Sequence, residues 1–283
     1  MSSPIGTMFT LVTGTGYTGR RVLERLPAES VTGLSRSVLD TGQPFEIFDL
    51  DSATTLPIEL PSTYAVIYTV PPKGDPPDNR LQRFLSMLTP APSRFIYIST
   101  TGVYGDCGGR TVTESTPVDP SGERAERRVA AEALIGEWAD TNDCDVVILR
   151  APGIYGPGRL GVERIRARMP VLAEQSANPG NRIHVDDLAS CCVAALSTSV
   201  PADIYNVGDN DHRSSTWFTH EVARQSELPA PPEVSREMAN REFSAQRLSF
   251  LTESRVVDTT KMREVLGVTP HYANPEDGIR ASL

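Results

Sequence analysis

The sequence predicts an α/β fold, a doubly wound parallel sheet with a smaller C-terminal substrate-side subdomain. Three observations predict it. Short apolar runs alternate with segments of helical periodicity, as in sheets that helices cover on both faces. A glycine-rich turn directly follows the first apolar run. The alternation fades from Gly156 to Gly180 and again from Asp209 to Arg255, where charged and proline-containing segments dominate.

The expected elements follow the order of a repeated strand and helix. Apolar runs indicate strands, and apolar residues at helical spacing indicate helices. The strands are expected at Phe9–Val12, Ser30–Leu34, Ala65–Val70, Arg94–Ile98, Val146–Leu149 and Ile204–Val207. The helices are expected at Thr18–Leu26, Asn79–Leu88, Gly122–Trp138, Val185–Leu196, Ser215–Gln225 and Thr259–Leu266.

The same rhythm divides the chain. We expect residues 1–155 to form a nucleotide-binding core and residues 156–283 to form a mixed region. Within the mixed region, 156–181 and 209–255 are predicted substrate-side insertions, whereas 182–208 and 256–283 return to the core.

Composition excludes several classes of protein. The formal net charge of −9 disfavours nonspecific binding to nucleic acid or to anionic membranes, which attract basic faces. No apolar stretch reaches membrane-span length and no signal-like segment is present, so a cytoplasmic protein is expected. The four cysteines lack C-x-x-C spacing. We expect reduced thiols, with Cys191 and Cys192 buried as small apolar groups, and no metal site.

The turn from Gly14 to Gly19 has the spacing G-x-G-x-x-G between a strand and a helix. Gly14 permits a tight turn, Gly16 lets the backbone approach a pyrophosphate, and Gly19 lets the helix pack closely on the strand. The turn therefore predicts a dinucleotide site that includes Tyr17 and Thr18. A purely structural glycine turn is the competing interpretation.

Further motifs follow the turn in a fixed order. They are Asp49-Leu50-Asp51, Tyr68-Thr69-Val70-Pro71-Pro72, Ile98-Ser99-Thr100-Thr101-Gly102-Val103-Tyr104-Gly105, Arg150-Ala151-Pro152-Gly153-Ile154-Tyr155-Gly156-Pro157-Gly158, Arg182-Ile183-His184-Val185-Asp186-Asp187 and Tyr205-Asn206-Val207-Gly208. Together they resemble the extended or atypical short-chain dehydrogenase/reductase superfamily, similar to NAD(P)-dependent sugar-nucleotide epimerases and dehydratases. The resemblance implies a Rossmann fold. The glycine turn has one residue fewer between its first two glycines than the common extended form, which resembles an atypical subgroup.

The segment after the second strand bears on the coenzyme. Arg36, beside Ser35, matches the donor set that pairs with an adenosine 2′-phosphate, so we expect NADP, with NAD as the alternative. Arg36 as a solvated loop residue remains open. The resemblance places Asp49 and Leu50 at the adenine, although a turn start also suits aspartate. Thr69, Pro71 and Ser99 are expected to line the coenzyme, with Pro71–Pro77 as a loop at the carboxyl end of a strand. A rigid connector is the alternative interpretation of this loop.

The resemblance implies a catalytic tyrosine with a lysine four residues later, and this pair is missing. The frame set by Glu132 places Arg124 and Arg128 there, and no tyrosine occurs between Tyr104 and Tyr155. Arginine stays protonated and cannot exchange the proton of a phenol. Arg128 could still bond ribose or phosphate, or form an anion clamp with Arg124. The alternative is a charged helix face that has no role in binding.

Other site residues come from the strand ends. The resemblance assigns Thr100 to the reacting oxygen. Tyr104 and Tyr155 are the leading replacements for the phenol, ahead of Asp106 and Cys107. Thr101, Tyr155 and Arg159 are expected to bind substrate. His184 is expected to be structural, with Asp186 as the N-cap of the following helix.

The resulting expectation is an NAD(P)-binding oxidoreductase or epimerase/dehydratase-like enzyme with an atypical site, acting on a small polar or sugar-like metabolite. The alternative is a catalytically degenerate NADP(H) sensor or partner-binding protein. The helix that contains Arg124 could support a homodimer, as in relatives, or face the protein's own core.

Overall fold

The computed structural model describes residues 8–74, 78–244, 248 and 253–283. Its centre is a seven-stranded sheet of order β11-β7-β5-β4-β1-β2-β3, in which every pairing is parallel. The strands are β1 (Phe9–Thr13), β2 (Val31–Ser35), β3 (Phe45–Ile47), β4 (Tyr64–Tyr68), β5 (Arg94–Thr100), β7 (Asp145–Ala151) and β11 (Ile204–Asn206). The predicted α/β fold with a parallel sheet is confirmed.

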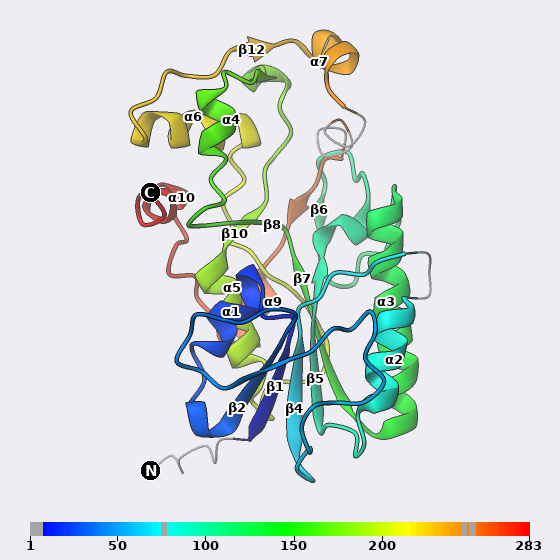
Figure 1. Cartoon of the computed structure of the whole chain (residues 1–283). Helices are drawn as coiled ribbons and strands as arrows, with labels where there is room; N and C mark the ends of the chain where they lie inside the picture. Colours follow the sequence, from blue (N-terminus) through cyan, green and yellow to red (C-terminus); the bar gives the residue numbers. More distant parts are fainter. Residues whose placement is uncertain (1–7, 75–77, 245–247, 249–252) are drawn as a thin grey trace.

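Helices cover both faces of this sheet (Figure 1). One face carries α1 (Tyr17–Leu23), α5 (Val185–Ala194) and α9 (Thr260–Glu264); the other carries α2 (Asn79–Met87) and α3 (Glu123–Asn142). Successive strand residues point to opposite faces, so Val12 packs in the α1/α5 layer and Leu11 in the α2/α3 layer. Cys191 and Cys192 are buried in the first layer, as expected.

Local sequence explains the helix that follows β4. Asp78 caps α2 by accepting a hydrogen bond from the backbone nitrogen of Arg80. Leu81, Phe84 and Leu85 then recur at helical spacing and are buried against the sheet. The cap on α5 differs from the expectation: His184, not Asp186, is the N-cap, because its Nδ1 accepts from the backbone nitrogen of Asp186.

A smaller group of elements lies beyond the carboxyl ends of the sheet (Figure 1). It comprises α4 (Val162–Arg166), β9 (Val171–Leu172), α6 (Ser215–Gln225), β12 (Glu233–Val234) and α7 (Arg236–Glu242), with β9 paired to β12. These elements fall in the predicted insertions 156–181 and 209–255, the second of which extends into residues outside the described ones. Their substrate-side role stays a prediction.

Short elements connect the two parts. They are β6 (Thr111–Val112) paired with β13 (Val256–Val257), β8 (Gly153–Tyr155) paired with β10 (Arg182–His184), α10 (Pro275–Arg280), and the 3-10 turns at Thr101–Tyr104 and Glu174–Ser176. A further 3-10 turn, Ala28–Ser30, precedes β2 at the opposite end of the sheet. None of the helices within the described ranges is long and apolar enough to cross a membrane.

Candidate functional site

A cavity of about 550 Å³ opens at the carboxyl ends of β1, β2, β4 and β5. Most of the residues that the sequence predicts for the site meet at its wall. These are Gly14, Gly16, Tyr17, Thr18, Ser35, Arg36, Asp49, Leu50, Thr69, Pro71, Ser99, Thr100, Arg124, Arg128 and Arg159. Gly19, Thr101, Tyr104 and Tyr155 lie elsewhere. Pro71 is described, whereas residues 75–77 of the predicted Pro71–Pro77 loop lie outside the described residues.

The glycine turn forms a cradle that larger residues would fill. Gly14 adopts a φ of +89°, and a Cβ there would lie 2.5 Å from Val70 Cγ2. A Cβ at Gly19 would overlap the carbonyl oxygen of Gly14. At Gly16, by contrast, a Cβ would meet nothing within 4 Å. The Thr69 hydroxyl braces the turn by donating to the Gly14 carbonyl oxygen.

The first turn of α1 opens onto this cradle. No side chain caps the helix at Gly16, and its first turn carries no acidic residue. Backbone N–H groups at a helix start attract anions. The residues present therefore fit the diphosphate of a dinucleotide, with Gly16 leaving the space that a phosphate group needs.

The far end of the cavity lies beside β2 and β3. Ser35 donates from its hydroxyl to the carbonyl oxygen of Ser37 at 2.7 Å. Its neighbour Arg36 is exposed and lines the same wall. Asp49 and Leu50 also line this end. Asp49 Oδ1 accepts from the backbone nitrogen of Asp51 at 3.0 Å, so the carboxylate also serves the turn.

Arg80 is a wall residue that the sequence analysis did not single out. Its Nη2 donates to the Pro71 carbonyl oxygen at 2.8 Å, and its Nε lies 3.5 Å from Asp51 Oδ1. A hydrogen bond from Lys73 lowers the pKa of Asp51. The only signal for Arg80 was its place at the start of the helix that follows the proline-rich loop.

The two arginines at the expected tyrosine and lysine positions differ in environment. Arg128 is buried, and its Nη1 donates to the Tyr97 hydroxyl at 3.0 Å and to the Ile98 carbonyl oxygen at 2.5 Å. Arg124 is exposed at the cavity wall. Both residues line the cavity, with Nη1 of Arg128 engaged with β5, and the expected clamp of Arg124 with Arg128 stays a prediction.

A buried ion pair fixes the end of β5. Glu132 Oε2 accepts from Arg150 Nη2 at 2.7 Å, and Glu132 Oε1 accepts from Arg150 Nε at 3.2 Å. The Ser99 hydroxyl also donates to Glu132. Thr100 Oγ1 accepts from the backbone nitrogen of Gly102 at 3.2 Å and lines the cavity. The wall at Ser99 and Thr100 is therefore tied to both α3 and β7.

The two tyrosines expected to replace the phenol do not reach this cavity, which corrects both expectations. Tyr104 is buried, and its hydroxyl donates to Asn206 Oδ1 at 2.7 Å and accepts from Arg150 Nη1 at 3.0 Å. Burial raises its pKa. Tyr155 packs edge-on against His184 and Phe218, and burial raises its pKa as well.

Thr101 and Gly19 take supporting positions. Thr101 is buried at the start of the Thr101–Tyr104 3-10 turn rather than at the cavity wall, so its predicted substrate contact is not supported by its position. Gly19 is packed behind the cradle against Gly14. Among the described residues, no group of three or more histidine, cysteine or acidic side chains could hold a metal ion.

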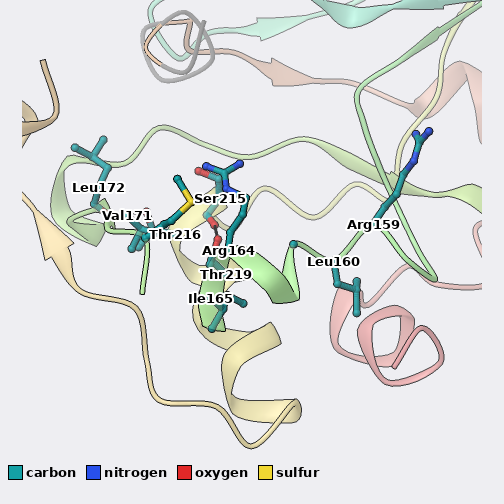
Figure 2. Close-up of a pocket in the computed structure, with 11 residues that line it drawn as sticks. Arg159, Leu160, Arg164, Ile165, Val171, Leu172, Ser215, Thr216 and Thr219 are labelled. Atoms are coloured by element: carbon teal, nitrogen blue, oxygen red, sulfur yellow. Dashed lines mark hydrogen bonds between the residues drawn. The ribbon is translucent and has the colours of Figure 1, made fainter. Parts of the chain in front are cut away.

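Arg159 joins this cavity to a second one. Its guanidinium lies 3.8 Å from the centre of the Tyr17 ring, a cation–π contact, and both residues line the first cavity. Arg159 also lines a cavity of about 360 Å³ formed by α4, β9 and α6 (Figure 2). Arg164, Ser215 and Thr219 supply polar groups there, while the Thr216 hydroxyl donates to the Leu172 carbonyl oxygen at 2.7 Å.

Comparison with known proteins confirms the expected resemblance. Residues 81–208 match the NAD dependent epimerase/dehydratase family. An uncharacterized protein, y4nG of Sinorhizobium fredii, is 28% identical over 202 residues, 65% of this chain and 50% of that protein. The chain thus spans about half the length of this curated relative, and 39% of the human dTDP-D-glucose 4,6-dehydratase that it also matches.

Solved structures extend the likeness to nearly the whole chain. A functionally unknown conserved protein from Silicibacter pomeroyi is 29% identical, with a TM-score of 0.79, and the match covers 97% of this chain and 98% of that one. UDP-glucuronic acid 4-epimerase from Bacillus cereus, solved with NAD, is 18% identical with a TM-score of 0.74 and 97% coverage of each chain. This second likeness is one of fold.

Proposed function

We propose that this chain, part of which matches the NAD dependent epimerase/dehydratase family, binds a nicotinamide dinucleotide in the 550 Å³ cavity and acts on a small polar or sugar-like metabolite. The observation that carries the proposal is the cradle of the glycine turn. Gly14 and Gly19 have no room for a side chain, whereas Gly16 faces open space at the start of an uncapped helix. A phosphate approaches the backbone at Gly16, so Gly16 is the glycine at which open space is needed.

The chain's own residues then take defined roles. Gly16 and the first turn of α1 hold the diphosphate, and Arg128 is placed to contact a ribose while it stays fixed to β5. Thr100 presents a hydroxyl to a reacting oxygen. When bound, the coenzyme supplies hydride chemistry. The second cavity, which Arg159 joins to the first, gives the substrate room beside it.

A preference for NADP over NAD is part of the proposal. Arg36 lines the cavity next to Asp49 and Leu50, and its charge is among those that lower the pKa of the nearby Asp51. A guanidinium is a strong partner for a 2′-phosphate. The matching family is described as NAD dependent, so Arg36 would make this chain differ from the family's usual coenzyme.

One observation favours a second function, that of a dinucleotide sensor without turnover. The expected tyrosine and lysine positions hold Arg124 and Arg128, and neither Tyr104 nor Tyr155 lines the cavity. A lost general acid or base typically costs about 10²- to 10⁴-fold in rate. Proton transfer in an active enzyme must therefore use another group or water.

Turnover separates the two functions. The purified protein is given NAD⁺, NADP⁺, NADH or NADPH with UDP-glucose, dTDP-glucose and a set of small carbonyl compounds. An enzyme shows turnover that Thr100→Val abolishes while coenzyme affinity is retained, and Thr113→Val, exposed and away from the cavity, leaves it unchanged. Coenzyme binding without any turnover supports the sensor. Turnover that survives Thr100→Val contradicts the role given to that hydroxyl.

A further inference from the structure

We propose that the β5 end of the coenzyme cavity is a binding site for an anionic group of the ligand, a carboxylate or a phosphate, formed by Arg124, Arg159 and Thr100. The inference rests on the proposed function, because it takes the rest of the cavity as the coenzyme's place. It assigns Arg124 to anion binding, at a position where the resemblance implies a proton-transferring phenol.

The distribution of charge along the cavity wall is the first argument. Its wall carries Arg36, Arg80, Arg124, Arg128 and Arg159 but, among the described wall residues, a single carboxylate, Asp49. Asp49 follows β3, which is four strands from β5 in the sheet order. At about 4.8 Å per strand this is about 19 Å. Among the described wall residues at β5 there is therefore no carboxylate, and Glu132, which lies behind Ser99, is paired with Arg150.

The sheet places the proposed residues at this end. Thr100 is the last residue of β5. Ala125, the neighbour of Arg124 on α3, lies beside Gly102, where an added Cβ would sit 3.9 Å from Ala125 Cβ and 3.4 Å from Thr100 Oγ1. Arg159 follows β8, which begins just after β7 ends, and β7 pairs with β5. All three residues line the same cavity.

The Arg159 side chain is oriented by Tyr17. Its guanidinium is stacked on the Tyr17 ring, and within the described part of the chain it forms no salt bridge. Stacking fixes the plane of the guanidinium, so less side-chain freedom is lost when an anion binds. Its place at both cavities puts it between the coenzyme and the remaining space for substrate.

The donor set selects the chemical class of ligand. Two guanidinium groups offer only N–H donors, and Thr100 can donate its hydroxyl proton because its oxygen already accepts from Gly102. Donors in a fork match the oxygens of a carboxylate or a phosphate. Arg128 adds positive charge, but its Nη1 is engaged with Tyr97 and Ile98. An anionic metabolite fits this end better than an uncharged one.

Calorimetric titration with inorganic phosphate and with oxalate tests the proposal, first on the protein saturated with coenzyme and then on the protein alone. We expect at least one probe to bind beside the coenzyme, and Arg124→Ala and Arg159→Ala each to weaken it by about tenfold or more. Arg124→Lys, which keeps the charge and loses the fork, should fall between. Arg127→Ala, on the same helix but ion-paired with Glu123, should bind as the parent does.

The outcomes are distinct. Binding of phosphate alone or of oxalate alone identifies which anion the site takes. The inference is overturned if neither probe binds, if the two alanine variants bind as Arg127→Ala does, or if the probe displaces the coenzyme. Failure of the proposed function is seen separately, when neither NADPH nor NADH binds in a titration made beforehand, and the titration of the protein alone still measures anion binding by Arg124.

Discussion

Arg128 is anchored to Ile98 by a hydrogen bond of 2.5 Å from its Nη1 to the Ile98 carbonyl oxygen. The same nitrogen donates to the Tyr97 hydroxyl, so the guanidinium is fixed against β5 while still lining the cavity. A cation at the expected lysine position is therefore retained, but as a fixed group that cannot exchange protons.

Replacing Arg128 by Met should lower the free energy of unfolding by about 2 kcal/mol, because the Ile98 carbonyl oxygen loses a buried partner. Coenzyme affinity should fall as well. Arg127→Met, at a half-buried position where the side chain pairs with exposed Glu123, should change the free energy by less than about 0.5 kcal/mol. Urea unfolding measures the free energy of unfolding of each variant. Equal losses for Arg128→Met and Arg127→Met would show that the hydrogen bond to Ile98 does not stabilise the fold.

Gly16→Ala should separate coenzyme binding from folding. The added Cβ meets no protein atom within 4 Å, so the free energy of unfolding should change by no more than about 1 kcal/mol. It should weaken coenzyme binding by about tenfold or more, because the Cβ takes the space for the phosphate. Gly136→Ala, a glycine of α3 with equally open surroundings, is the matched control and should bind normally. Normal binding by Gly16→Ala would place the diphosphate elsewhere.

Arg36→Ala should change coenzyme preference rather than overall binding. Loss of a charge-assisted bond is worth about 1.5–3 kcal/mol, so affinity for NADPH should fall about 10- to 100-fold. Affinity for NADH should stay nearly constant. The paired titrations, with Arg166→Ala as a surface control, give the ratio directly. Equal losses for both coenzymes would remove the basis for an NADP preference.

Asp209 should make stability depend on pH. Burial raises its pKa to about 7, above the value of about 3.9 in an unfolded chain. Between these values the folded state holds a proton that the unfolded state has released, so the stability contribution of Asp209 falls as pH rises and is lowest above pH 7. The full effect is at most about 4 kcal/mol.

Asp209→Asn removes this titration while keeping an oxygen to accept from the backbone nitrogen of Asp211. The difference in stability in favour of the variant should be larger near about pH 8 than near about pH 5. Asp140→Asn, on the exposed surface of α3, should show no such trend. Urea unfolding at both pH values decides, and a difference that does not grow with pH would contradict the assignment.

The sequence predicted the central strands because apolar runs between helices are a strong signal in parallel sheets. It ended β5 and β7 too early, since Ser99, Thr100 and Arg150 are polar residues of strand ends that form the site. It missed β3, whose short run holds an exposed edge position at Ile47. Polar strand ends and short edge strands carry little apolar pattern.

Candidate site residues were predictable where a local motif fixes their place, as in the glycine turn. Tyr104 was not, because a 3-10 turn directs its ring toward Asn206 and Arg150, away from the cavity. The stack of Arg159 on Tyr17 and the position of Arg80 depend on contacts between segments distant in the chain. Local spacing gives no sign of such contacts.

Calorimetric titration of the purified protein with NADPH and NADH tests the central claim most directly. The structure predicts one bound coenzyme per chain, with NADPH the tighter ligand and with binding lost in Gly16→Ala. Absence of binding by both coenzymes, or binding that Gly16→Ala leaves unchanged, would contradict a dinucleotide site at the glycine turn.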